Sequence, residues 1–185
     1  MPRRARQWLW LVACAAAALP DLARAAVPSE AEVKAEFVER FTRFIEWPAG
    51  ARPAPDAPFV VCTWGESPLS ARLEQVLVSR RIQDHPVRVK RLRQLEAADG
   101  CHILYLAPGA REQVAGIAAE LRGRPILSVG DNPGFAELGL IINLFVDDDL
   151  HVRFEINAEA ARGSGLQISA KLMTLAKQTT ARPGQ

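Results

Sequence analysis

The sequence predicts an α/β domain that is built on a mostly parallel β-sheet and has an antiparallel hairpin near its C-terminus. Between residues 59 and 130, short apolar runs alternate with segments whose apolar residues recur at helical spacing. Apolar strands separated by amphipathic helices are typical of βαβ units, in which the strands lie parallel. Beyond residue 139, two apolar segments flank the acidic turn Asp147–Asp149, which is the pattern of a hairpin. A composition of 49% hydrophobic and 24% charged residues is typical of one globular domain with a proper core.

The start of the chain differs from the rest. Three arginines precede an apolar run over residues 8–19, and the small-residue segment 23–25 follows at the spacing that signal peptidase needs. The run is shorter than the ~20 residues of a membrane span. The sequence therefore predicts a secretory signal peptide over residues 1–25, a single α/β domain over residues 26–185, and a periplasmic location.

Cys14 leaves a second route of export open. Residues 11–14, Leu-Val-Ala-Cys, fit a lipoprotein cleavage box, and cleavage there would leave Cys14 lipidated at the new N-terminus. The apolar stretch before Cys14 is short for that route, so we prefer the signal-peptide interpretation.

The first predicted helix begins at the capping box formed by Ser29 and Glu32. Its apolar residues recur every three to five positions, so the helix is expected to end near Trp47. They are Val33, Phe37, Val38, Phe41, Phe44 and Ile45. Four prolines between residues 48 and 58 then predict a stiff surface linker that cannot be helical.

The remaining elements follow from the same kinds of pattern. Continuous apolar runs predict strands that are covered on both faces, and a serine followed by proline predicts a helix start. The expected elements are, in order, a strand over 59–65, a helix opened by Ser67 and Pro68, strands over 85–92 and 101–107, a helix over 110–121, a strand over 125–130, hairpin strands over 139–146 and 150–157, a helix capped by Asn157, a break at 163–165, and a helix over 166–177.

We find no residue pattern that is typical of catalysis. The sequence has no Gly-x-Ser-x-Gly elbow, no Walker loop and no Gly-x-Gly-x-x-Gly. The three histidines lie in separate predicted strands, and none has a His or Cys partner at metal-ligand spacing. The sequence therefore predicts no catalytic residues, no metal site and no cofactor. Removing residues 1–25 changes the formal net charge from +2 to about −1, and a near-neutral domain lacks the basic surface of a nucleic-acid-binding protein.

Two charged segments could have a functional role, but each can also be explained as an ordinary structural feature of the fold. The acidic turn Asp147–Asp149 does not match a known calcium-binding loop, and aspartate is common in turns. Residues 80–93 carry six basic side chains, which could meet an acidic partner or lipid headgroups. The alternation of valines with basic residues is explained more simply by a solvated strand face.

The ends of the predicted parallel strands are the best candidates for a ligand or partner surface. In open α/β sheets, ligands bind outside the carboxyl ends of the strands. Trp64 and Glu66 lie at the carboxyl end of one strand, and Asp131 and Asn132 lie at the carboxyl end of another. Together with residues 107–109 they are expected to form a shallow pocket with an aromatic wall and helix N-termini facing it. The alternative interpretation is that these polar residues only form the turns that follow the strands.

Cys62 and Cys101 are predicted to form a disulfide. They are the only cysteines of the expected mature chain, and an even pair in an oxidising compartment favours a bridge. Their strands are expected to be adjacent, with the cysteines level, because the first strand of a doubly wound sheet is usually central. The alternative is two buried thiols. A redox-enzyme role is not expected, since the sequence has no Cys-x-x-Cys.

Three stretches of the sequence converge on one family. They are KAEFVERFTRFIEWP at 34–48, CHILYL at 101–106 and VRFEINAEAARGSGLQISAKLMTLA at 152–176. In this order and spacing they resemble the YfiR-like family of small periplasmic proteins, over about residues 33–177. The resemblance implies a three-layer α/β/α sandwich with a mostly parallel sheet. Some relatives carry a second cysteine pair near the hairpin, which this chain lacks.

The best-known members of this family are periplasmic repressors. They bind the periplasmic domain of an inner-membrane diguanylate cyclase and hold it inactive, and a peptidoglycan-associated outer-membrane lipoprotein can sequester them. The resemblance therefore implies a non-enzymatic negative regulator of cyclic-di-GMP synthesis, with these two proteins as partners and a homodimer left open. The alternatives are a periplasmic small-ligand-binding sensor module and an enzyme of unrecognised type.

The aromatic end of the first helix has two interpretations. In the structural one, Phe37, Phe41 and Phe44 pack onto the sheet, and Trp47 closes the edge of the core. In the functional one, Trp47 belongs to a contact surface, because tryptophan is enriched at binding hot spots. The helical spacing of the phenylalanines favours the structural interpretation.

Overall fold

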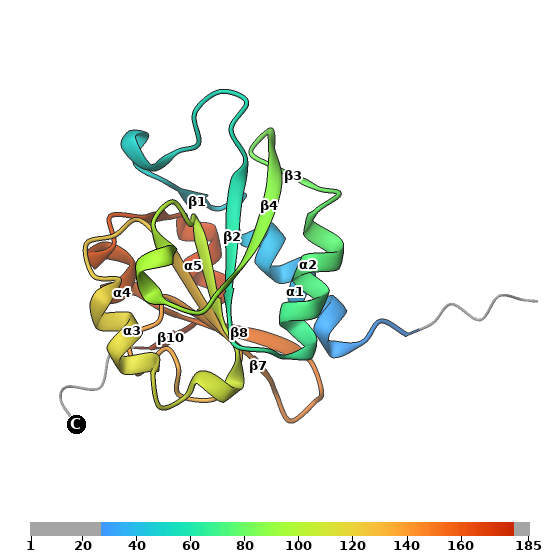
Figure 1. The fold of residues 1–185 in the computed structure, drawn as a ribbon. Coiled ribbons are helices and arrows are strands. Elements are labelled where there is room, and N and C mark those ends of the chain that lie inside the picture. The colour runs from blue at the N-terminus through green and yellow to red at the C-terminus, as the bar shows by residue number, and fades with distance from the viewer. Residues whose placement is uncertain (1–26, 180–185) are drawn as a thin grey trace, which may run out of the picture.

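The computed structural model describes residues 27–179 and confirms the mixed α/β class. One eight-stranded sheet runs through the domain in the order β10-β8-β7-β6-β5-β2-β4-β3 (Figure 1). Its strands are β2 (Phe59–Trp64), β3 (Arg81–Ile82), β4 (His85–Leu92), β5 (Ile103–Leu106), β6 (Leu127–Gly130), β7 (Ile142–Val146), β8 (Val152–Asn157) and β10 (Lys177–Thr179). A separate two-stranded sheet pairs β1 (Ile45–Glu46) with β9 (Gln167–Ile168). The predicted signal peptide and Cys14 lie outside the described residues.

Helices cover both faces of the main sheet, which confirms the three-layer sandwich. They are α1 (Glu30–Phe41), α2 (Pro68–Leu77), α3 (Val114–Glu120), α4 (Ala158–Gly163) and α5 (Ala170–Leu175), with 3₁₀ turns η1 (Ala49–Ala51), η2 (Leu95–Ala98) and η3 (Pro108–Ala110). Figure 1 shows α1 and α2 on one side of the sheet and α3 on the other. The core accordingly has two parts, one that α1, α2 and α5 share with the sheet and one beneath α3.

The strand order places the switch point of the sheet beside β2. The strands β4, β2, β5, β6 and β7 lie side by side and are all parallel. Counted in chain order, this is the 2-1-3-4-5 arrangement of doubly wound sheets, which bind ligands at the carboxyl ends of the first and third strands. Here these strands are β2 and β5. The antiparallel pairing of β7 with β8 confirms the predicted hairpin.

The first helix ends earlier than the sequence predicted. The expected capping box is present, but α1 stops at Phe41 instead of near Trp47. Ile45 is then buried and Glu46 exposed, because β1 pairs with β9 in an extended conformation. The helical spacing of the apolar residues continues through Phe44 and Ile45, whereas a two-residue strand is too short to reveal an alternating pattern.

Gln83, on the β3–β4 turn, holds this segment in place. Its side-chain amide donates to the carbonyl oxygens of Thr42 at 2.9 Å and Ile45 at 3.2 Å, just beyond the end of α1. Trp47 follows in the core, 2% exposed, with its ring edge-on to Phe59 and 5.2 Å between centroids. A side chain that is so deeply buried offers almost no surface to a partner, which agrees with the structural interpretation of the aromatic segment.

The sequence predicted one helix over residues 166–177, and this prediction was wrong. The segment forms β9, the short helix α5 and the start of β10. The backbone N–H of Ser169 donates to the carbonyl of Phe44 at 2.9 Å, so contact with β1 replaces helical hydrogen bonding here. The helix that was predicted over 110–121 likewise begins only at Val114, because Pro108 opens a separate 3₁₀ turn before it.

Candidate functional site

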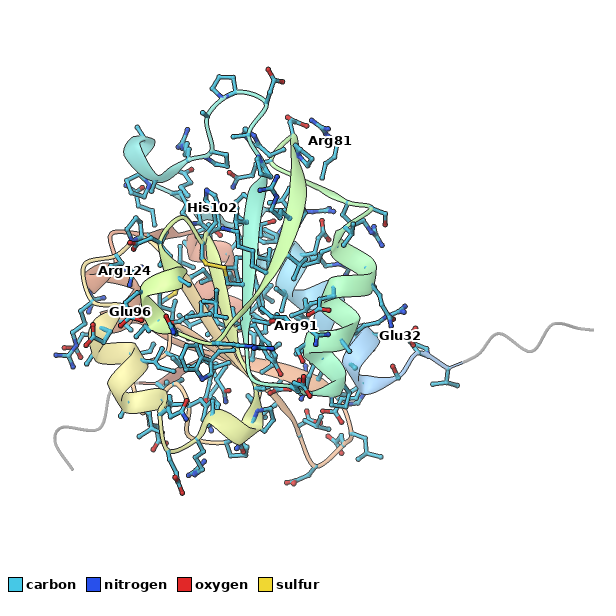
Figure 2. All side chains as sticks on the ribbon, viewed as in Figure 1. Glu32, Arg81, Arg91, Glu96, His102 and Arg124 are labelled. Atoms are coloured by element: carbon cyan, nitrogen blue, oxygen red, sulfur yellow. A yellow bond between two sulfur atoms is a disulfide. The ribbon has the colours of Figure 1, made fainter. Side chains whose placement is uncertain are left out.

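The predicted disulfide between Cys62 and Cys101 is present, with 5.9 Å between the two Cα atoms (yellow bond in Figure 2). The strands β2 and β5 are neighbours, as expected. The two cysteines are not level, however, because Cys62 pairs with Leu104 and Cys101 precedes β5. Both side chains are buried on the α3 side of the sheet. The bridge therefore ties the approach to β5 to the middle of β2 inside the core.

His102, labelled in Figure 2, secures the same junction by hydrogen bonds. Its backbone N–H donates to the carbonyl of Val60 at 2.8 Å, and the backbone N–H of Val60 donates to the ring Nδ1 at 2.9 Å. The ring stacks on Phe59 with 4.5 Å between centroids. Because Nδ1 accepts, the neutral ring carries its proton on Nε2. Burial lowers the pKa of His102 below its ordinary 6.5, and the charge of nearby His85 adds to this effect.

A cavity of about 410 Å³ lies at the carboxyl ends of the central strands. It is lined by the first turns of α1 and α2, by Pro108 after β5, and by Asp131 after β6. Its size is within the ~300–1,000 Å³ of small-molecule pockets. We call this cavity the strand-end pocket; it lies where the topology of the sheet predicts a ligand site.

Buried polar groups form a chain of hydrogen bonds at the strand-end pocket. The hydroxyl of Tyr105 donates to Asp131 Oδ1 at 2.9 Å and lies 2.8 Å from the hydroxyl of Ser67. A tyrosine hydroxyl has one proton, so Ser67 is the donor in the second bond. Ser67 is also the N-cap of α2 and accepts from the backbone N–H of Ser70. Tyr105 is fully buried, and burial raises the pKa of its hydroxyl.

Lys34 extends this chain to the first helix. Its Nζ lies 2.5 Å from Glu30 Oε1 and 3.7 Å from Asp131 Oδ2. The side chains of Lys34 and Asp131 are 6% and 9% exposed, whereas that of Glu30 is 59% exposed. Burial raises the pKa of Asp131 above its ordinary 3.8, against the opposing effects of Tyr105 and Lys34. The site is therefore a buried lysine–aspartate pair with an exposed acid, Glu30, at its rim.

Of the strand-end residues predicted for this surface, Asp131 and Pro108 line the pocket, whereas Trp64, Glu66 and Asn132 do not. The indole N–H of Trp64 donates to Gln113 at 2.8 Å, beside α3 on the other face of the sheet. Glu66 projects into solvent with 91% of its side chain exposed, and Asn132 is not among the lining residues. The wall that Trp64 was expected to supply is made instead by the starts of α1 and α2.

The sequence did not single out Lys34 or Tyr105, and it identified Ser67 only as a helix cap. One signal was available for Lys34. It precedes Val38 by four positions and Phe41 by seven, so it lies on the buried stripe of α1. A lysine is rarely buried without a charged partner. Its place on that stripe could have indicated a polar site beneath the helix.

The hairpin turn brings Asp147, Asp149 and His151 together, with candidate ligand atoms within 4.8 Å of one another. Asp147 already accepts from Arg153 Nε and from the backbone N–H of His151, both at 2.8 Å. The bond from Arg153 lowers the pKa of Asp147 below its ordinary value. These contacts are those of a turn that stabilises itself, as the ordinary interpretation expects.

The basic segment 80–93 mostly faces solvent. Arg88 and Lys90 are exposed on β4. Arg91, which is labelled in Figure 2, donates to Glu74 of α2 at 2.8 Å. This placement agrees with a solvated strand face. Across residues 27–179, no helix is long and apolar enough to cross a membrane.

The fold and site together define a doubly wound α/β domain of three layers, with a disulfide beside its central strand and a polar pocket at the switch point of its sheet. A model of the YfiR/HmsC-like family matches residues 31–177, and the protein belongs to that family. The match confirms the resemblance that the three sequence stretches carried. A comparison with curated proteins gave no match.

Proposed function

We propose that this protein is a periplasmic, non-enzymatic negative regulator of cyclic-di-GMP synthesis. It binds the periplasmic domain of an inner-membrane diguanylate cyclase and keeps the enzyme inactive. The observation that carries this proposal is membership of the YfiR/HmsC-like family over residues 31–177. The Cys62–Cys101 bridge supports it, because disulfides persist in oxidising compartments such as the periplasm.

Repression of this kind requires a preference for one state of the cyclase. A ligand with equal affinity for two conformations shifts nothing, and moving an equilibrium from about 99:1 to 1:99 takes a ~10⁴-fold difference in affinity. The regulator must therefore bind the inactive cyclase far more tightly than the active one. An outer-membrane lipoprotein that competes for the regulator would then release the enzyme by mass action.

Deletion of the gene tests the proposal. It should raise cyclic-di-GMP and surface attachment in a cell that contains the partner cyclase, and the full-length chain should restore both. A version without residues 1–25 serves as the control, since it is not exported and should not restore them. Unchanged cyclic-di-GMP under several growth conditions, or rescue by the unexported version, would contradict the proposal. A pull-down from inner membranes would identify the cyclase.

The strand-end pocket favours a second function, that of a small-ligand sensor. A cavity of about 410 Å³ beside a buried ion pair is a feature that repression by surface contact does not need. The two functions are compatible, because a ligand that binds only one state of a regulator changes its affinity for a partner. A sensor without a cyclase partner would leave cyclic-di-GMP unchanged on deletion and would still bind its ligand.

A further inference from the structure

We infer that the strand-end pocket binds the carboxylate group of a small organic acid, which takes the place of Glu30 beside Lys34. The inference deepens the sensor function proposed above and rests on it for its biological meaning. Its chemical basis is the arrangement of charges around the pocket, which can be tested on the purified protein alone.

The ammonium group of Lys34 has unused hydrogen-bonding capacity. It carries three donor hydrogens. Among residues 27–179, the carboxylates near it are those of Glu30 at 2.5 Å and Asp131 at 3.7 Å. The second separation is longer than a hydrogen bond. The side chain of Lys34 is 6% exposed and lines the pocket, so its remaining N–H groups can donate only to a molecule inside the pocket.

Glu30 shows which chemistry suits this position. Its carboxylate already lies against Lys34 Nζ from the rim of the pocket, but 59% of the side chain is exposed to water. Glu30 is the solvent-exposed partner of this ion pair, so water can solvate its carboxylate once the carboxylate leaves Lys34. Glu30 can therefore turn into solvent when a ligand carboxylate takes its place and pairs with the Lys34 ammonium, which keeps a negative charge beside the buried lysine. Glu30 acts as a competitor that is built into the chain.

The surroundings favour a single negative charge over a positive charge or a dianion. Both α1 and α2 begin at the pocket, so the positive ends of two helix dipoles face it. Asp131 is not free to bind a cation, since Tyr105 donates to one of its oxygens and Lys34 pairs with the other. One lysine beside an aspartate does not neutralise a phosphate dianion. Because the charges of Lys34 and Asp131 cancel, the positive potential that remains is that of the two helix N-termini, which suits one negative charge better than two.

The rest of the lining suits an apolar tail on the ligand. Ala31, Pro68, Leu69 and Pro108 present mainly carbon atoms to the pocket. The volume of about 410 Å³ accommodates a molecule of a few carbon atoms. A short aliphatic acid is therefore the simplest probe, with the amine of equal length as its charge-reversed counterpart.

The experiment titrates the purified exported protein with butyrate, n-butylamine or inorganic phosphate and follows amide chemical shifts by NMR. Butyrate should bind with a Kd on the order of 1 mM, as expected of so small a ligand, with shifts around Lys34, Ser67 and Asp131. Butylamine and phosphate should bind at least tenfold more weakly. Absence of butyrate binding, or preference for the amine or phosphate, would overturn the inference.

Two substitutions on α1 give opposite expected effects. Glu30→Gln removes the competitor and should tighten butyrate binding roughly 2–5-fold, the range of a partly exposed ion pair. Lys34→Met removes the donor and should weaken binding at least ~10-fold, as expected for loss of a charge-assisted hydrogen bond. The controls are Glu36→Gln and Arg40→Met, which make the same changes of charge on α1 outside the pocket and should leave the Kd unchanged.

Glu30→Gln keeps the test valid if Lys34→Met fails to fold. Weaker butyrate binding by Glu30→Gln would show that Glu30 helps the ligand, which contradicts its role as a competitor. All of these measurements are made without a cyclase. A protein that binds butyrate as described but does not change cyclic-di-GMP in cells would refute the repressor function alone, whereas the reverse result would refute only the pocket chemistry.

Discussion

Replacing both Cys62 and Cys101 by alanine should strongly destabilise the protein without altering its surface. The bridge joins residues that are 39 positions apart, and the chain-entropy model gives about 4 kcal/mol for a loop of that length. This is a large share of the ~5–15 kcal/mol that stabilises a typical domain. In a domain of ~150 residues, each kcal/mol corresponds to roughly 2–4 °C in melting temperature. The expected decrease in melting temperature is therefore about 8–16 °C.

Thermal unfolding followed by circular dichroism measures this decrease. A reductant should lower the melting temperature of the wild-type protein to a similar degree, and it should have no effect on the double variant, which serves as the matched control. Thiol titration of the unfolded, unreduced mature protein should find no free thiol. A decrease of less than ~2 °C, or two titratable thiols, would show that the bridge does not constrain the unfolded chain.

Repression should follow stability in the same variant. Because both sulfurs are buried, the substitution removes no atom from the surface that a partner contacts. The double variant should therefore lose repression at the growth temperature and regain it when the cells are grown well below its melting temperature. Loss of repression in a variant that is fully folded would refute this reasoning and would place the bridge in the regulatory contact itself.

Three further outcomes are expected. Burial lowers the pKa of His102 in the folded protein, so the unfolded chain takes up a proton first as the pH falls below the ordinary 6.5. The melting temperature should therefore decrease from about pH 7 to pH 5. In His102→Gln it should decrease less steeply over the same range. An equal dependence of melting temperature on pH in the wild type and in His102→Gln would contradict a contribution of His102 to this loss of stability. Trp47→Ala should cost ~3–5 kcal/mol of unfolding free energy in urea titrations, whereas a loss below ~1 kcal/mol would revive the contact-surface interpretation. Gln83→Ala should cost ~0.5–1.5 kcal/mol, because two carbonyl oxygens lose a hydrogen-bond donor. The control Arg88→Ala, at an exposed position of β4, should cost less than ~0.5 kcal/mol.

Local patterns predicted the strands of the main sheet that are long enough to show one, whereas β3 and β10, with two and three residues, were not predicted. The continuous apolar run of β2 and the alternation of Val87 and Val89 with basic residues in β4 are visible within single segments. The adjacency of β2 and β5 followed from a topological rule. The exact register did not, which is why Cys62 lies level with Leu104 and not with Cys101.

Two features could not be read from neighbouring residues. The segment of Ile45 and Glu46 is extended only because it pairs with β9, far along the chain, and its own spacing is compatible with a helix. The strand-end pocket likewise depends on Lys34 of α1 meeting Asp131 after β6. Asp131 was recognised from its place at a strand end, whereas Lys34 needed the packing of α1 over the sheet to acquire a partner.

The pairing of β1 with β9 also imposes an order of events on a chain that emerges from its N-terminus. The Ile45–Glu46 segment appears early, and its partner Gln167–Ile168 appears only when nearly all of the domain has emerged. Local and medium-range contacts form before contacts of long sequence separation, because long loops are costly to close. During that interval Ile45 lacks the strand that completes its pairing. The pairing of Ile45 and Glu46 is therefore among the last parts of the fold to be completed.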